Sequence, residues 1–177
     1  MLWADVVLGE PSATELPSPD TARTLNNLGA LYQEQGRYNE AEPLLKRALA
    51  IREGVLGTAH PDTATTLSNL GALYKSQGRY DDAEPLLKRV VEIQREAFGG
   101  KDVETARALN DLALLYADRK QYAEAENLYL EAATIFVELR DQNNPEVATI
   151  LDNLSKVLKA SGHESRYDGI VDRIIKK

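Results

Sequence analysis

Two helical patterns of apolar residues alternate along the chain. The first pattern follows the 3.6-residue period of a helix at Ala22, Leu25, Leu28 and Tyr32. The second follows the sequence QGRY at residues 35–38 and has the same period at Ala41, Leu44, Leu45, Ala48 and Ile51. No segment shows the strict alternation of a half-buried strand. The pattern therefore predicts an all-α chain of amphipathic helix pairs, each joined by a short turn.

This two-helix unit recurs every 42 residues. LNNLGALY at residues 25–32 returns as LSNLGALY at 67–74, as LNDLALLY at 109–116 and, more altered, as LDNLSKVL at 151–158. Residues 18–57 and 60–99 are identical at 25 of 40 aligned positions. We predict repeats at about 18–59, 60–101, 102–143 and 144–177, with the last acting as a C-terminal cap. Residues 1–17 precede the repeats, and we expect them to form an N-terminal extension or cap.

Residues suited to helix ends recur at equivalent positions. Four residues stand just before a predicted first helix, three of them good N-caps: Ser18, His60, Asp102 and Asn144. A proline or valine and then an acid follow each of them, which suits the start of a helix. Gly36 and Gly78 can supply the positive φ of a tight turn. The spacings Asn39–Glu42 and Asp81–Glu84 predict a capping box at the start of each second helix.

Neither helix of a unit can bury its apolar stripe alone, so the units are expected to stack into an α-solenoid. The motif Leu28-Gly29-x-x-Tyr32, followed by Ala41, Leu45 and Ala48, resembles the tetratricopeptide repeat signature. The unit exceeds the usual 34 residues, and its sequence looks like the long repeats of kinesin light chain and its bacterial relatives. The resemblance covers about residues 18–177. It implies a right-handed superhelix that acts as a protein–protein interaction module, in an adaptor or scaffold role.

A polar stripe runs beside the apolar one on each first helix. Asparagine occupies one position of this stripe in three units, as Asn27, Asn69 and Asn153, and Asp111 replaces it in the third unit. A carboxamide offers one acceptor and two donors, so it can pair with both polar groups of a peptide backbone. The resemblance implies that first helices line a concave surface where an asparagine ladder holds the ligand backbone. The three asparagines match that ladder, and Asp111 interrupts it.

We therefore predict that the concave groove binds an extended or short helical peptide of a partner protein. The predicted groove residues are Arg23, Asn26, Asn27, Asn69, Lys75, Arg107, Asn110, Asn153 and Lys156. Basic and acidic side chains of the groove nearly balance, which predicts no strong preference for a charged ligand. A second interpretation is that the asparagines bond between neighbouring helices and hold the solenoid together. The two roles can coexist.

Composition excludes several other classes of function. The chain has 21 basic and 28 acidic residues, a formal charge of −7, which argues against nucleic-acid binding. It has no cysteine and only two histidines, and no phosphate loop or nucleophile motif, so we expect no enzyme activity, metal or cofactor. No apolar run is long enough to span a membrane, and the first residues do not resemble a secretory signal. These features predict a cytoplasmic protein with no membrane contact.

An alternative function is a structural or regulatory solenoid of a larger protein, which self-associates through its ends and leaves the groove empty. Its discriminating feature would be exposed apolar residues at the two ends: Trp3, Val6, Val7 and Leu8, and Ile170, Ile174 and Ile175. On either interpretation we expect a monomer or a weak homo-oligomer.

Overall fold

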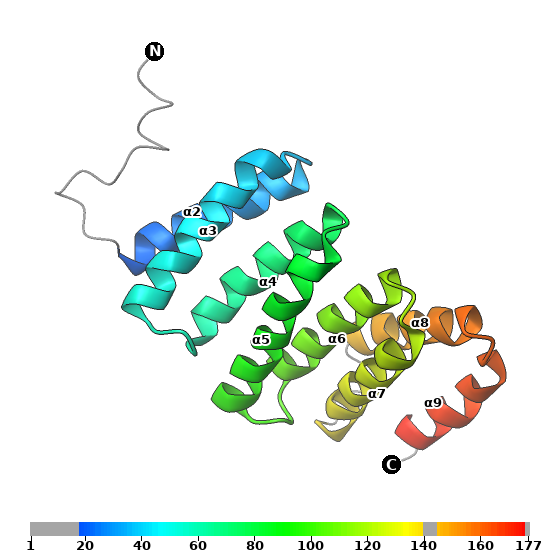
Figure 1. Cartoon of the computed structure of the whole chain (residues 1–177). Helices are drawn as coiled ribbons and strands as arrows, with labels where there is room; N and C mark the ends of the chain where they lie inside the picture. The colour runs from blue at the N-terminus through cyan, green and yellow to red at the C-terminus, as the bar shows by residue number, and fades with distance from the viewer. Residues whose placement is uncertain (1–17, 140–144, 176–177) are drawn as a thin grey trace.

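The computed structural model describes residues 18–139 and 145–175, which form α-helices and one short 3₁₀ helix, without strands in these two ranges. The elements are α2 (Pro19–Glu34), α3 (Tyr38–Val55), α4 (Pro61–Ser76), α5 (Tyr80–Phe98), α6 (Val103–Asp118), α7 (Tyr122–Glu138), α8 (Pro145–Ala160), η1 (Glu164–Arg166) and α9 (Tyr167–Ile175). Antiparallel helix pairs stack side by side along the chain (Figure 1). The predicted all-α repeat solenoid is therefore confirmed.

The first helices begin where the sequence places them. Ser18, His60 and Asp102 each cap a helix, because their side chains accept hydrogen bonds from the backbone amides of Thr21, Asp62 and Glu104 at 2.8–3.1 Å. The predicted cap Asn144 lies outside the described residues. The starts of α2, α4, α6 and α8 are 42 residues apart, so the structural units follow the 42-residue repeat of the sequence.

The turn inside each unit uses one left-handed residue. Gly36 and Gly78 have φ of 73° and 72°, as the sequence predicts, and Gly162 has 77° at the equivalent position of the fourth unit. Lys120 takes this position in the third unit with φ of 62°, a conformation that favours glycine. The backbone turn is thus retained where the glycine is lost.

The predicted capping boxes of the second helices are wrong. Helices α3 and α5 begin at Tyr38 and Tyr80, one residue before Asn39 and Asp81, and no side chain caps them. Asn39 is therefore inside the first turn and cannot act as an N-cap. Glu42 instead accepts hydrogen bonds from the next unit, from the Tyr74 hydroxyl at 3.1 Å and Arg79 Nη1 at 3.0 Å.

The two sets of helices form different sides of the stack. Helix α2 contacts α4, α4 contacts α6 and α6 contacts α8, with Cα atoms within 8 Å of each other. Within the described residues no second helix approaches the next one as closely, except for α7 and α9. Ion pairs between long side chains bridge the second helices instead, such as Arg89–Glu53 at 2.6 Å and Arg95–Glu131 at 2.5 Å. The first helices therefore lie closer together and line the inner side.

At the C-terminal end, two of the three apolar residues that the self-association alternative would expose are not exposed. Ile170 and Ile174 on α9 are buried, because they pack into the hydrophobic core. They therefore provide no exposed surface for self-association. The corresponding N-terminal residues Trp3, Val6, Val7 and Leu8 lie outside the described residues, as do the predicted extension 1–17 and the last two lysines.

Gln94 is an energetically unfavourable residue in the interior. It is buried on α5, and its Oε1 has no hydrogen-bond partner among the described residues. Gln94→Met is expected to raise the free energy of unfolding by about 1 kcal/mol, because it replaces an unpaired buried oxygen by an apolar group of similar size. Urea unfolding followed by circular dichroism measures this change. A lower stability of the variant would show that Oε1 has a partner.

Candidate functional site

The predicted groove residues all lie on the first helices. Arg23, Asn26 and Asn27 come from α2, Asn69 and Lys75 from α4, Arg107 and Asn110 from α6, and Asn153 and Lys156 from α8. We call the side of the stack that these helices line the inner face.

Three asparagines form a connected group between α2 and α4. Asn69 Nδ2 donates to Asn26 Oδ1 at 3.0 Å, and Asn26 Nδ2 donates to Asn27 Oδ1 at a longer 3.5 Å. Asn26 is only 4% exposed, whereas Asn27 is exposed and Asn69 is half-buried. The bond between helices is the structural role that the sequence left open. It fixes the orientation of Asn69 at the inner face.

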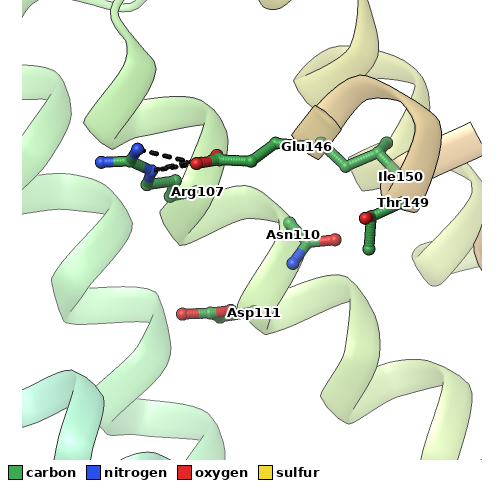
Figure 2. Close-up of a pocket in the computed structure, with 6 residues that line it drawn as sticks. All are labelled: Arg107, Asn110, Asp111, Glu146, Thr149 and Ile150. Carbon is green, nitrogen blue, oxygen red and sulfur yellow. Dashed lines mark hydrogen bonds and ion pairs between the residues drawn. The ribbon is translucent and has the colours of Figure 1, made fainter. Parts of the chain in front are cut away.

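A pocket of about 280 Å³ lies between α6 and α8 (Figure 2). It is lined by Arg107, Asn110, Asp111, Glu146, Thr149 and Ile150. Arg107 reaches from α6 to α8, where its Nε lies 3.0 Å from both carboxylate oxygens of Glu146, and its Nη1 lies 2.5 Å from Glu104. The hydrogen bonds to Glu146 are the main reason why the pKa of Arg107 is raised. This arginine therefore clamps two helices at the edge of the pocket.

Asn110 and Asp111 supply acceptor oxygens to this pocket. Asn110 Oδ1 is buried and has no hydrogen-bond partner among the described residues. Burial raises the pKa of Asp111, while the positive charge of Lys75 and a hydrogen bond from Asn110 oppose this rise. The Asp111 side chain is nevertheless exposed. Both observations fit a carboxylate in a concave surface, where water reaches it from one side and protein surrounds the others.

A second pocket of about 260 Å³ lies further along α6 and α8, against α7. Its lining is Leu114, Ala117, Asp118, Tyr122, Tyr129, Asn153, Lys156, Val157 and Ala160. Asn153 is half-buried, and its carboxamide makes no hydrogen bond within residues 18–139 and 145–175. Lys156 Nζ lies 2.6 Å from Asp152 on its own helix. This pocket therefore combines an apolar wall with a free carboxamide.

The basic side chains of the inner face are already paired. Arg23 lies 3.0 Å from Asp20, and Lys75 Nζ lies 3.8 Å from Asp118 on the next first helix. Together with the pairs of Arg107 and Lys156, these contacts neutralise every predicted cation of the groove. Sequence reasoning identified the cations but missed Glu104 and Glu146 as partners of Arg107. The i, i+3 spacing of Glu104 signals its pairing, whereas no local signal points to Glu146.

Among the residues that the structure describes, no group of three or more His, Cys, Asp or Glu side chains is arranged to hold a metal ion. Nor is any described helix both long and apolar enough to cross a membrane.

Comparisons with known proteins agree with this architecture. The sequence model of the tetratricopeptide repeat family matches residues 20–96, 73–138 and 104–166. The structure is similar to BtubC (BKLC) from P. vanneervenii, with a TM-score of 0.80, 25% identity, and coverage of 90% of this chain and 64% of that one. It is also similar to the nearly identical TPR-like repeats of a kinesin-light-chain-type protein from Podosopora anserina, with a TM-score of 0.79, 23% identity, and coverage of 91% and 76%. No curated protein matches the sequence.

Proposed function

The chain belongs to the tetratricopeptide repeat family, and we propose that its inner face binds a peptide segment of a partner protein. Repeats of this family form protein–protein interaction modules and scaffolds, and the fold is typically non-catalytic. The finer proposal concerns where the peptide binds. Solenoids of stacked repeats present extended concave surfaces suited to such ligands.

The observation that carries the proposal is the pair of neighbouring pockets between α6 and α8. The first has the unpaired Oδ1 of Asn110 beside the Asp111 carboxylate, and the second has the free carboxamide of Asn153 beside apolar residues. A peptide backbone supplies amide donors at regular spacing, and side chains fill apolar pockets between them. The third and fourth units are therefore the proposed centre of the binding surface.

The pairing of the groove cations supports a ligand that is not strongly acidic. Arg107 already binds two carboxylates, so an acidic peptide would have to displace Glu146 or Glu104. In the first and second units, Asn69 is the proposed contact, and Asn26 acts by orienting it through their 3.0 Å hydrogen bond.

The test is a comparison of two asparagine variants on a selected peptide. A phage-displayed random peptide library, panned on the full chain, supplies the probe, and fluorescence anisotropy gives its Kd. Asn153→Ala is expected to weaken binding about 3–10-fold, because it removes a hydrogen bond to the ligand. The matched control Asn127→Ala changes an exposed asparagine of the second helix α7 and should leave the Kd unchanged.

Equal Kd values for wild type and both variants would contradict a groove site, as would a library that yields no binding peptide. Asn69→Ala is a poorer test, because its loss of the bond to Asn26 also changes the contact between α2 and α4.

A further inference from the structure

Helix α2 exposes a face that the first helices of the second and third units bury. Leu31 is 48% exposed, whereas the equivalent Leu73 and Leu115 are 0% exposed. An apolar side chain of this size contributes to stability only when it is removed from water. The exposed position therefore marks a contact that the second and third units make and that the described part of the first unit does not.

The rest of this face shows the same difference. Leu25, Leu28 and Tyr32 are only partly buried, whereas their equivalents in the second and third units are buried: Leu67, Leu70, Tyr74, Leu109, Leu112 and Tyr116. We call Leu25, Leu28, Leu31 and Tyr32 the N-terminal edge face. It is a contiguous apolar surface, since these residues recur at helical spacing on one helix.

In the three later units, the equivalent face of the first helix packs against a second helix. Helix α3 packs on α4, α5 packs on α6 and α7 packs on α8, so each first helix is covered by the second helix of the preceding unit. An arginine–tyrosine stacking contact of the second unit is also present at the end of α2. The Arg37 guanidinium stacks 3.9 Å from the Tyr32 ring centroid, as Arg79 stacks 4.0 Å from that of Tyr74. The edge face is therefore one half of the standard contact between units.

We propose that residues 1–17 of this chain cover the N-terminal edge face. The 42-residue register aligns Leu2, Trp3, Val6 and Val7 with positions of the second helices that lie in or against the hydrophobic core, such as Leu44, Leu45, Ala48 and Leu49. The segment joins α2 directly at its cap Ser18 and carries no lysine or arginine beside the Arg37 cation. It thus supplies the kind of apolar surface that the face lacks.

The segment is long enough for this contact. Helix α2 has 16 residues and is about 24 Å long, whereas 15 extended residues between Trp3 and Ser18 span up to about 50 Å. The apolar residues can therefore return along α2 as far as Leu31. A second copy of the chain is a less suitable occupant, because the apolar residues Ile170 and Ile174 at the opposite end are buried.

Trp3 is the only tryptophan of the chain, so its fluorescence reports on the segment in the full-length protein. The proposal predicts a blue-shifted emission and protection from acrylamide quenching. Leu31→Lys should shift the emission to longer wavelength, because loss of the apolar contact lowers the ratio of docked to free segment at least about fivefold. The matched control Phe98→Lys changes a side chain that is also 48% exposed, on α5, and should leave Trp3 unaffected.

Two outcomes would overturn the proposal. Emission and quenching typical of free tryptophan in the wild type, unchanged by Leu31→Lys, would show that the segment does not contact α2. A Trp3 signal that shifts with protein concentration, together with a rising mass in light scattering, would show that a second copy covers the face. Neither outcome bears on the proposed centre of the peptide site, because that centre lies on α6 and α8 and the edge face lies on α2.

Discussion

Phe136→Ala is expected to lower the free energy of unfolding by about 3–5 kcal/mol, because it leaves a cavity where a completely buried aromatic ring packs. Phe136 lies on α7, the helix that packs on α8 and so joins the fourth unit to the third. In a stacked repeat protein, stability is approximately the sum of unit and interface contributions. The loss should therefore fall mainly on the fourth unit.

Thermal unfolding of the variant, followed by circular dichroism and by native-state hydrogen exchange, measures both effects. Amides of α8 and α9 should lose protection first, and those of α4 and α5 should change least. Phe98→Ala is the control, since this phenylalanine is 48% exposed and its removal should cost less than about 1 kcal/mol. A uniform loss of protection along the chain would show that the units unfold together.

The position of Phe136 also shows why the repeated sequence predicts the fold well but predicts the buried residues less well. The equivalent residues are Arg52 and Gln94, and all three are buried. Arg52 Nη1 bonds to the Thr66 hydroxyl at 2.7 Å, so a charged residue is accommodated by a polar partner on the next helix. A pattern read along one helix classifies Arg52 as a surface residue. Its burial depends on a residue in the following unit.

Helix starts, turns and stacking order were predictable because they depend on local chemistry that recurs every 42 residues. Ser18 and Asp102 cap their helices through side chains two or three residues from the bonded amide, and Gly36 and Gly78 form turns within their own segments. The inner face was predictable for the same reason, since helical spacing alone puts its residues on one side.

The partners of the inner-face residues were not predictable. Asn26 and Asn69 are 43 residues apart, and Arg107 and Glu146 are 39 apart, so their pairing follows from how neighbouring units stack. The failed capping boxes have the same origin. Glu42 and Glu84 have the local spacing of a cap, but the stacking of the next unit brings a tyrosine hydroxyl and an arginine to them.

The second large effect is expected at this recurring carboxylate. Glu84 accepts from the Tyr116 hydroxyl at 3.0 Å and from Arg119 Nη1 at 2.6 Å, both on the following unit, and pairs with Lys88 on its own helix at 2.7 Å. Glu42 has the equivalent set of Tyr74, Arg79 and Lys46. The network therefore joins consecutive units at a half-buried carboxylate. Glu84→Gln should lower stability by about 1–3 kcal/mol at neutral pH, since hydrogen bonds to a charged group are the stronger kind.

The pH dependence of this loss separates the charge from the shape of the side chain. The hydrogen bond from Lys88, with those from Tyr116 and the charge of Arg119, holds the pKa of Glu84 below its ordinary value of 4.5. A carboxylate whose pKa is lower in the folded state stabilises the fold above about pH 4.5, and this contribution is lost as the pH falls through the folded pKa. The difference in urea midpoint between wild type and Glu84→Gln should therefore be largest at pH 7 and shrink below pH 4.

Glu92→Gln, on an exposed side chain of the same helix, should stay within about 0.5 kcal/mol of wild type at both pH values. A difference for Glu84→Gln that is constant with pH would mean that its carboxylate charge does not couple the units.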